Sequence, residues 1–545
     1  MSKSVLLLGI ILLALSLRFF QLDSNPPSLT WDEAAWGYNA YALGLDGRDE
    51  FGRFLPYDYL KSFGDFKPPM YAYITIIPIM VFGLSEFAVR FPSALFGTLA
   101  VFITYFLVKQ IFRNSDQREY YALLTSLLLA ISPWHILLSR AAFEANIASF
   151  FIIIGAYFFI KGVQEKGWFL VLSAIFFTLS IYTFNSARVV APLLVFILAL
   201  GSYKALLKRK KQTILAGIIG IVVVLPIFGF LLSSEASLRF KEVNIFSDSS
   251  IVTTSNKYIA NDEHAWWSKI IHNRRISYAQ AYIKHYLDNL SPDFLFIKGD
   301  GNPKFSTQDV GQLYLWELPF FIAGILFLIK KKEGRWWMIP LWIIVALVPA
   351  GLARETPHAL RIANALPMFQ ILTAYGIIQL FTALKKINQG RLYIWKAAVL
   401  GTILVAFAFL IYFLHGYFIH YPREFSGEWQ YGYKESISYV ASQKDKYKKI
   451  YITDALGRAY IYYLFYLKTL PSQFRNTADY QIDGFGLIDV RGYNNMIFSR
   501  SVESEPQEPN TLYIIRSDKV PVGADILKTF YLLDGSPRLT AYVYK

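Results

Sequence analysis

The chain has 545 residues, of which 54% are hydrophobic and 17% are charged, and its mean hydropathy is +0.35. A soluble domain carries about 25% charged residues, and apolar runs of about 18 or more residues recur here, so we predict a polytopic α-helical membrane protein. The formal charge of +15 is explained more simply by basic cytoplasmic loops than by nucleic-acid binding. The lack of cysteine excludes disulfides, thiolate metal sites and cysteine nucleophiles, and the lack of a GxxxxGK[ST] loop argues against ATP as an energy source.

The first apolar run extends from Val5 to Phe20. A cleaved signal peptide and an uncleaved membrane anchor both fit such a run. No small-x-small cleavage site follows it, so we favour an anchor with the N-terminus in the cytoplasm. On either interpretation the loop that follows lies outside.

Short basic linkers set the orientation of the remaining apolar runs. Strongly basic linkers lie at 204–211, 330–335 and 385–396, and weaker ones at 109–118 and 161–166. Lys and Arg concentrate in cytoplasmic loops, and about eleven spans place all of these linkers inside. The predicted spans are 5–22, 86–110, 119–137, 145–162, 167–184, 188–204, 212–232, 312–330, 335–353, 362–383 and 394–416.

One apolar run does not fit this topology as a span. Met70 to Leu84 has only about 15 residues, whereas a crossing helix needs about 20. Counting it as a span would place the basic linker at 204–211 outside. We therefore expect a helix that lies on the outer interface, and Pro78 favours an irregular piece.

The topology predicts two domains. Residues 1–419 form the transmembrane domain, with large outer loops at 23–85 and 233–311. Residues 420–545 form a polar tail, which is extracytoplasmic by parity and has a normal size for a small domain.

The tail contains its own secondary-structure signals. Residues 448–453, 511–515 and 539–544 have the composition of short strands, and residues 459–467 that of a helix. We therefore predict a small α/β domain.

The first outer loop contains two adjacent carboxylates, Asp32 and Glu33. Neighbouring residues do not share a helix face. One interpretation is a solvated helix start, in which Thr30 is the N-cap and Glu33 completes a capping box. The other is that one carboxylate points into a pocket. The surrounding aromatic residues suit sugar rings or the bilayer interface: Trp31, Trp36, Tyr38 and Tyr41.

Cationic residues recur in the predicted outer regions. Lys67 precedes two prolines, which stiffen the backbone, and it is either a snorkelling lysine or a contact for a lipid phosphate. Three more cationic candidates for the donor or substrate site follow at the outer end of later spans: Arg354, His358 and Arg361. Interface anchoring is their alternative. Together they favour an anionic lipid ligand.

The third outer turn contains Arg140 and Glu144 at the mouth of a span. They are either an internal ion pair or helix cap, or a substrate contact and an acid of the site. The histidines of the long outer loop, at 264, 272 and 285, have spacings that fit no zinc pattern. We therefore predict no metal site.

The ordered segments resemble a known family. The chain places an Asp-Glu pair after the first helix, then Lys-Pro-Pro, then Glu86-Phe87-Ala88-Val89-Arg90-Phe91-Pro92, and the later segments Ser132-Pro133…Arg140…Glu144, Ser291-Pro292-Asp293-Phe294, Gly311-Gln312-Leu313-Tyr314 and Pro357-His358-Ala359-Leu360-Arg361. This set resembles the polytopic lipid-dependent glycosyltransferases of the GT-C type, which include protein O-mannosyltransferases and the aminoarabinose transferase of lipid A. The resemblance covers about residues 5–420.

The resemblance implies a polyprenyl-phosphate-linked sugar as donor and an acceptor hydroxyl or amine on the outer face of the cell membrane. By this match Asp32 is the general base, Glu33 orients the acceptor or stiffens the loop, and Glu144 is the second acid. Lys67 and Arg361 hold the donor phosphate. Arg90 is expected to pack the loop against the second span. Protein, lipid, teichoic and polysaccharide acceptors all fit.

The chemistry supports the same roles. A carboxylate that removes the acceptor proton contributes about 10²–10⁴-fold, and cations stabilise the leaving phosphate in a site shielded from water. One base with cations and no nucleophile pair predicts single displacement with inversion. Lys and Arg can replace a metal, so we expect no cofactor, with a divalent cation as the alternative.

Three alternatives remain. A ligase or polymerase of polyprenyl-diphosphate glycans would use Arg354, His358 and Arg361, and Asp32 would be dispensable. A lipid-sugar transporter would place ionisable residues inside its spans, where this chain has almost none. A non-catalytic sugar-binding relative is disfavoured because Asp32, Lys67 and Glu144 are all present.

Overall fold

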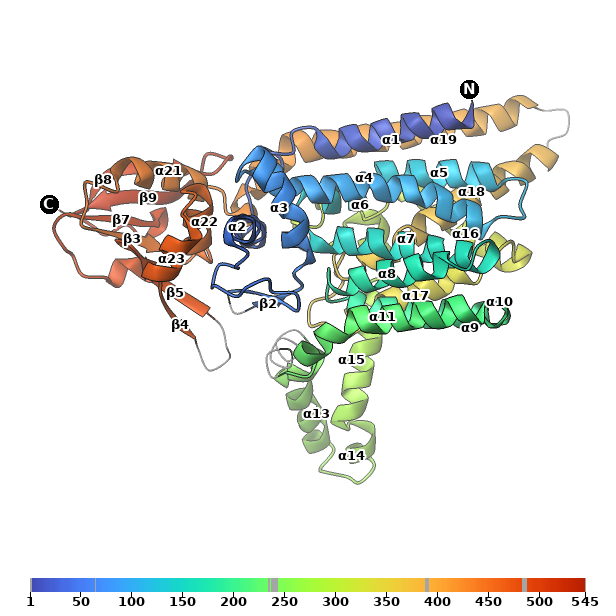
Figure 1. Ribbon diagram of the computed structural model, residues 1–545, viewed down its shortest axis with the longest axis horizontal. Helices are drawn as coiled ribbons and strands as arrows, with labels where there is room; N and C mark the ends of the chain where they lie inside the picture. Colours follow the sequence, from blue (N-terminus) through green and yellow to red (C-terminus); the bar gives the residue numbers. More distant parts are fainter. Residues whose placement is uncertain are drawn as a thin grey trace. The chain divides into compact units, whose positions relative to one another are not determined.

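The computed structural model describes residues 2–63, 65–233, 236, 244–387, 392–482 and 488–544 (Figure 1). They form two compact units. The first, here called the helical unit, comprises Met1–Leu17, Phe96–Leu138 and Glu144–Phe413. The second, here called the loop–tail unit, comprises Arg18–Leu95, Ser139–Phe143 and Leu414–Lys545.

Apolar helices occupy all eleven ranges that were predicted to span the membrane. They are α1 (Lys3–Phe19), α4 (Glu86–Ile111), α5 (Arg118–Ile131) with α6 (Pro133–Arg140), α7 (Glu144–Gln164), α8 (Phe169–Ile181), α9 (Ala187–Gly201), α11 (Lys210–Leu231), α16 (Leu318–Lys331), α17 (Met338–Gly351), α18 (Met368–Ile387) and α19 (Leu392–His415). The short helix α10 (Tyr203–Lys208) lies in the basic linker before α11. Within the described residues, five helices are long and apolar enough to cross a membrane, or six if the bent pair α5–α6 counts as one span. The number of eleven spans stays a prediction.

Two helices indicate directly that the helical unit is embedded in lipid. The span containing α11 has a mean hydropathy of 2.8 and is only 11% buried, and the span containing α19 has a mean hydropathy of 2.5 and is 6% buried. A helix that is apolar on all sides and yet uncovered by protein is stable only where lipid covers it.

Glycines allow two of these helices to pack closely. A Cβ on Gly324 of α16 would lie 2.0 Å from the carbonyl oxygen of Leu372, and a Cβ on Gly376 of α18 would lie 1.9 Å from that of Phe320. The backbones of α16 and α18 therefore touch, in the manner of small-residue contacts between membrane helices.

The third predicted span is not one straight helix. The axis bends by 57° between α5 and α6. Ser132 between them is extended, with φ −60° and ψ 125°, because the proline that follows disfavours a helical conformation at the preceding residue. The predicted span 312–330 also begins later than expected, since its α-helix starts at Leu318 after the short 3-10 helix η3 (Leu315–Glu317).

The predicted outer loop 233–311 is largely helical. It contains η1 (Ile245–Ser247), α13 (Ser249–Asn261), α14 (Ser268–Ile271), α15 (Arg274–Asp288) and η2 (Asp293–Ile297). Helices α13 and α15 pack against each other, with α14 at their far end (Figure 1). Residues 234–235 and 237–243 of this loop, like residues 388–391 of the predicted basic linker and 483–487 of the tail, lie outside the described residues.

The loop–tail unit begins with the first outer loop. It contains α2 (Trp31–Asp46), the antiparallel pair β1 (Leu60–Ser62) and β2 (Asp65–Lys67), and α3 (Met70–Phe82). Helix α3 packs on α2, where Gly44 makes room for the side chain of Met80. The predicted irregularity at Pro78 is wrong, because α3 continues through it as one 13-residue helix.

The tail forms a seven-stranded sheet in the order β4-β5-β6-β3-β7-β9-β8. Its strands are β3 (Lys449–Thr453), β4 (Asp479–Ile482), β5 (Ile488–Tyr493), β6 (Met496–Ser499), β7 (Thr511–Arg516), β8 (Asp525–Tyr531) and β9 (Pro537–Val543). The central strand β3 is parallel to β6 and β7, and the outer pairs are antiparallel. The predicted strands at 448–453, 511–515 and 539–544 are confirmed, and so is the α/β class of the tail.

Helices complete the tail. They are η5 (Gly416–His420), α20 (Tyr421–Phe425), η6 (Ser426–Trp429), α21 (Tyr433–Gln443), α22 (Ala459–Tyr466), α23 (Pro471–Thr477), η7 (Val502–Ser504) and η8 (Ser517–Lys519). The helix predicted at 459–467 is α22, and it packs on α2 of the first loop.

Polar side chains of the tail contact the first loop. Tyr462 donates its hydroxyl to the carbonyl oxygen of Leu29 at 3.1 Å, and Arg475 forms an ion pair with Asp46 at 2.6 Å. A Cβ on Gly37 of α2 would lie 2.5 Å from the ring of Phe465, so the two helices approach closely there. The tail is therefore part of the wall that surrounds the first loop.

Candidate functional site

An ion pair joins Asp32 and Lys67, the two residues that the sequence placed at the centre of the site. Asp32 is in the first turn of α2, and Lys67 is the last residue of β2, paired in register with Leu60 of β1. The ammonium of Lys67 donates to Oδ1 of Asp32. The Asp32 side chain is 50% exposed, whereas the Lys67 side chain is 7% exposed. The carboxylate is therefore accessible, and the cation lies beneath it.

Aromatic rings enclose the ammonium of Lys67. Its Nζ lies 5.1 Å from the ring centre of Trp36 and 5.0 Å from that of Phe63. Cation–π contacts of this kind hold a lysine in place without neutralising its charge. The charge of Lys67 is thus held in place by Asp32 and by two aromatic rings.

Glu33 has a different environment from its neighbour. Its side chain is 1% exposed, and the predicted capping box is confirmed: the Thr30 amide donates to Oε2 at 2.9 Å, and Oγ1 of Thr30 accepts from the Glu33 amide at 3.2 Å. Oε1 also accepts from Nε of Arg90 and from the Ala142 amide, each at 2.9 Å. Glu33 therefore ties together three segments of the chain.

Arg90 completes this buried network. It is 0% exposed, and besides Glu33 it donates to the carbonyl oxygens of Leu22 at 3.2 Å, Pro26 at 2.8 Å and Ser28 at 2.5 Å. The charged guanidinium is paired and its donors are used, as burial requires. This is the packing role expected for Arg90.

Arg140 has structural contacts rather than an open position. It is 0% exposed and donates to the carbonyl oxygens of Arg18, Gln21 and Asn25 at 3.3, 3.2 and 2.8 Å, and to the hydroxyl of Tyr417 at 3.2 Å. The carbonyl of Arg18 belongs to the last turn of α1, and those of Gln21 and Asn25 follow this helix. Arg140 thus braces the chain at the end of α1, and its role as a substrate contact stays a prediction.

A second pair of acids, Asp49 and Glu50, lies behind the ion pair. Both are fully buried. Glu50 accepts from Nδ2 of Asn39 at 3.0 Å and from the hydroxyl of Tyr460 at 3.1 Å. Burial and the neighbouring Asp49 raise the pKa of Glu50 to about 8. At neutral pH Glu50 is therefore mainly protonated.

The aromatic set predicted around Asp32 divides into two groups. Trp36 and Tyr38 are 2% and 0% exposed, and Trp36 packs on Tyr71 with ring centres 5.6 Å apart. Their prediction as a sugar-binding surface is wrong, because a buried ring has no free face. Trp31 and Tyr41 are half-buried.

The other predicted site residues belong to the helical unit. Glu144 is the first residue of α7 and is half-buried. Arg354 is exposed, and Arg361 is half-buried and donates to the carbonyl oxygen of Glu355 at 3.0 Å. The two arginines therefore provide positive charge at the surface of the cluster from Arg354 to Arg361.

His358 lies in the same cluster but is 11% exposed. Its Nδ1 is 3.9 Å from Oδ2 of Asp300, and its ring lies 5.0 Å from that of Phe305. Burial, with the nearby charge of Arg361, lowers the pKa of His358 to about 3. Burial raises the pKa of Asp300 to about 6. His358 is therefore a neutral side chain at pH 7 and does not add a positive charge.

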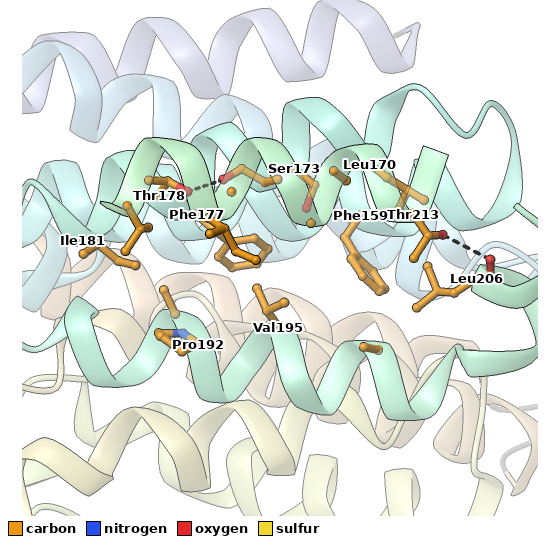
Figure 2. Close-up of a pocket in the computed structure, with 18 of the residues that line it drawn as sticks. Phe159, Leu170, Ser173, Phe177, Thr178, Ile181, Pro192, Val195, Leu206 and Thr213 are labelled. Atoms are coloured by element: carbon orange, nitrogen blue, oxygen red, sulfur yellow. Dashed lines mark hydrogen bonds between the residues drawn. The ribbon is translucent and has the colours of Figure 1, made fainter. Parts of the chain in front are cut away.

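An apolar cavity of about 530 Å³ lies among α7, α8, α9, α10 and α11 of the helical unit (Figure 2). Its few hydroxyls are those of Ser173, Thr178 and Thr213. Oγ1 of Thr178 donates to the carbonyl oxygen of Ala174 at 2.8 Å, and Oγ1 of Thr213 donates to that of Leu206 at 3.1 Å. The remaining wall is hydrocarbon, with rings such as Phe159. The cavity therefore suits an apolar chain rather than a polar ligand.

No group of three or more His, Asp or Glu side chains that could hold a metal ion occurs in the described part of the chain.

Three residues near the Asp32–Lys67 ion pair were not predicted from the sequence: Glu50, Phe63 and Arg458. Arg458 is at the N-cap of α22, and its guanidinium carbon lies 5.2 Å from the ring centre of Phe63. The signal in the sequence was a strand followed by a glycine-containing turn and a helix, which is typical of ligand-binding edges in α/β sheets.

With this geometry described, the chain can be compared with known proteins. Residues 66–230 match the family described as dolichyl-phosphate-mannose-protein mannosyltransferase. A protein of Aquifex aeolicus (strain VF5), itself uncharacterized, is 31% identical over 215 residues, which are 38% of this chain and 40% of that relative. The match spans less than half of either chain.

Solved structures match over nearly the whole length. ArnT from Cupriavidus metallidurans in the apo state has a TM-score of 0.54 at 12% identity, covering 99% of this chain and 97% of ArnT. ArnT bound to undecaprenyl phosphate has a TM-score of 0.52 at 14% identity. The oligosaccharyltransferase of Archaeoglobus fulgidus, tethered with an acceptor peptide, has a TM-score of 0.52 at 12% identity over 94% of this chain and 69% of that one. The chain has the GT-C fold. The resemblance predicted from the sequence is thereby confirmed.

Proposed function

We propose that this GT-C protein is an integral membrane glycosyltransferase that transfers a sugar from a polyprenyl-phosphate donor to an acceptor hydroxyl or amine on the outer face of the membrane. The observation that carries the proposal is the accessible carboxylate of Asp32 paired with the buried, aromatic-flanked ammonium of Lys67. A base and a cation for phosphate are the two groups that such a transfer requires.

The donor phosphate would exchange partners with Asp32. In the structure the ammonium of Lys67 donates a hydrogen bond to the carboxylate of Asp32. When the phosphate oxygen takes the ammonium of Lys67, the carboxylate is released to accept a hydrogen bond from the acceptor. Glu50 does not compete, because its pKa of about 8 keeps it mainly neutral.

The reaction then proceeds as a single displacement with inversion. The acceptor oxygen forms a bond to the anomeric carbon while its proton moves to the carboxylate of Asp32. The bond between that carbon and the phosphate oxygen breaks, and its electron pair leaves with the phosphate. The monoanionic diester becomes a dianionic monoester, and Asp32 becomes neutral, so the total charge is conserved. Lys67 stabilises the charge that develops on the leaving group.

Glu33 serves this reaction through the fold. Its carboxylate is saturated by Arg90, Thr30 and Ala142, which supports the role of stiffening the loop over that of orienting the acceptor. Arg140 likewise braces the loop. From the resemblance, Arg361 is a second ligand of the donor phosphate and Glu144 a second acid, and Arg354 adds surface charge.

Two findings support a lipid-linked donor. ArnT, whose fold this chain shares, has been solved bound to undecaprenyl phosphate. The chain also has a cavity of about 530 Å³ whose wall is almost wholly hydrocarbon (Figure 2), which suits an isoprenoid chain. The experiment below identifies the sugar and the acceptor.

The test is transfer by purified protein in detergent from a panel of radiolabelled polyprenyl-phosphate sugars to membrane and protein acceptors. We expect Asp32→Asn to lower turnover by about 10²–10⁴-fold and Lys67→Met to be similarly impaired. EDTA should leave the rate unchanged, because lysine and arginine provide the positive charge. Lys61→Met is the matched control, since Lys61 lies on the same hairpin, opposite Phe66, and should retain normal activity.

Near-normal turnover by Asp32→Asn in folded protein would contradict the proposal. Consumption of a diphosphate-linked glycan by that variant would instead favour the ligase, with its centre at Arg354, His358 and Arg361. A rate abolished by EDTA and restored by a divalent cation would replace the metal-independent mechanism.

A further inference from the structure

The tail brings one loop to the edge of the Asp32–Lys67 site. The loop joins β3 to α22 and includes Asp454, Gly457 and Arg458. It follows the carboxyl end of β3, which lies between its parallel neighbours β6 and β7. In open α/β sheets this edge, where connections leave the central strand to opposite sides, is where ligands bind.

The backbone of this loop is shaped to lie against α2. Gly457 and Arg458 have φ angles of +93° and +55°, and Oδ1 of Asp454 accepts from the Ala459 amide at 2.5 Å. A Cβ on Gly457 would be 3.1 Å from the ring of Trp31, the residue before Asp32. Glycine is therefore needed at this point for the close approach.

A shared aromatic ring connects Arg458 with Lys67. The guanidinium carbon of Arg458 lies 5.2 Å from the centre of the Phe63 ring, and Nζ of Lys67 lies 5.0 Å from the same centre. The two charges are thus no farther apart than the sum of these distances. Among the described residues the guanidinium of Arg458 has no hydrogen bond or ion pair, and the side chain is half-buried.

Both residues of the contact between Arg458 and Phe63 have an unfavourable, left-handed backbone conformation. Phe63, which is buried, has a φ of +59°, and Arg458 has a φ of +55°. A left-handed conformation is unfavourable for a residue with a side chain. Such strain persists where the surrounding fold enforces it, and it concentrates at ligand clamps and active sites.

We propose that Arg458, supplied by the tail, is a further cationic ligand of the lipid phosphate, in addition to Lys67 and to the Arg361 implied by the resemblance, and that it serves chiefly the dianion left after transfer. This inference rests on the proposed function. The reacting diester carries one negative charge, which Lys67 meets. The leaving monoester carries two, and among the described residues of the loop–tail unit Arg458 is a cation that contacts the same Phe63 ring as Lys67. The tail is then a structural half of the donor site.

The proposal predicts an effect that depends on the charge of the ligand. A phosphate monoester loses its second proton with a pKa near 6, so undecaprenyl phosphate is a dianion at pH 8 and a monoanion at pH 5. We would measure its binding to the full-length protein in detergent at both values, with undecaprenol as the uncharged control. Arg458→Ala should weaken binding about tenfold at pH 8, which corresponds to one charge-assisted contact, and less than about threefold at pH 5.

Two further variants separate ligand binding from packing. Arg458→Lys, which keeps the charge, should recover most of the affinity at pH 8. Arg475→Ala is the matched control, because it removes another arginine by which the tail contacts the first loop, the partner of Asp46. It should leave both affinities within about twofold. In a transfer assay Arg458→Ala should weaken product inhibition by undecaprenyl phosphate more than it raises the donor KM.

The outcomes are distinct. Equal weakening at pH 5 and pH 8, or the same loss in Arg475→Ala, would overturn the proposal and assign Arg458 to packing. Normal binding by Arg458→Ala, with Lys67→Met impaired, would overturn it while the proposed function stands. Wild-type protein that binds undecaprenyl phosphate no better than undecaprenol would overturn both.

Discussion

The first outer loop and the cluster from Arg354 to Arg361 were both predicted to bind an anionic lipid, and the structure gives them different chemistry. In the first loop an accessible carboxylate forms an ion pair with a buried lysine. In the cluster, burial lowers the pKa of His358 to about 3, so of its three cationic candidates only the two arginines carry positive charge. Burial, rather than residue type, decides which ionisable group is available for a reaction.

The same contrast occurs between adjacent residues. Asp32 is half-exposed, whereas Glu33 is 1% exposed and accepts hydrogen bonds from three segments. A carboxylate such as Glu33, whose oxygens accept several hydrogen bonds from the protein, stabilises the fold. A half-exposed carboxylate such as Asp32 can react. The following predictions distinguish charged groups that stabilise the fold from charged groups that can react, first within the loop and then between the loop and the cluster.

The largest effect is expected for Glu33→Ala. Removing this carboxylate leaves the buried Arg90 without its counter-charge, which costs about 3–5 kcal/mol of unfolding free energy. The matched variant Asp32→Ala removes a half-exposed carboxylate, so water can reach the ammonium of Lys67 in its place, and it should cost clearly less. The measurement is the thermal unfolding midpoint of both variants in the same detergent.

Similar midpoints for Glu33→Ala and Asp32→Ala would contradict the assignment of Glu33 to the fold. A repaired double variant provides the control: Glu33→Gln with Arg90→Met removes both charges and should be more stable than Glu33→Ala alone. Destabilisation by Asp32→Ala of the same size would mean that Asp32 is also structural.

Much of the fold could be predicted from local patterns. The eleven helical ranges follow from the length of the apolar runs, and the capping box at Thr30 and Glu33 follows from a three-residue spacing. The strand β3 and the helix α22 were also found in this way. These features depend on residues that are neighbours in sequence, so composition and periodicity suffice.

The remaining features depend on contacts between distant segments. The break between α5 and α6 was signalled by Pro133 and was overlooked because the apolar run continues through it. The contact of Arg458 with Phe63 arises from the packing of the tail on the first loop, hundreds of residues apart in sequence. No local pattern encodes such contacts, and a candidate site read from the first loop alone therefore lacked the contribution of the tail.

A smaller effect is expected for the buried acid behind the site. Asn39, Tyr460, Asp49 and Lys67 surround Glu50 and act on its charge. Its pKa of about 8 in the folded protein lies above the ordinary value of 4.5. Between these two values the folded state holds a proton that the unfolded state has lost, so the unfolding free energy falls as pH rises, by about 1.4 kcal/mol per pH unit from this group. Glu50→Gln should lack this part of the slope.

The experiment compares unfolding midpoints of the wild type and Glu50→Gln from pH 5 to pH 9. We expect the wild type to lose stability relative to the variant up to about pH 8, and the difference to level off above it. Asp46→Asn is the control, because Arg475 lowers the pKa of Asp46 below its ordinary value of 3.8, and its contribution is constant over this range. Parallel curves for wild type and Glu50→Gln would show that Glu50 is ionised in the folded protein at neutral pH.

The smallest effect is expected in the cluster, for His358→Gln. Because His358 is already neutral above about pH 3, replacing it with an uncharged side chain should change kcat/KM less than about threefold at pH 7. It should also leave the pH profile between pH 6 and pH 8 unchanged, whereas an ordinary histidine ionises near pH 6.5. The measurement is the pH dependence of transfer for both proteins, with Asp32→Asn as the inactive reference. An inflection near pH 6.5 that disappears in His358→Gln would move the proton transfer to the helical unit and reduce Asp32 to a packing partner of Lys67.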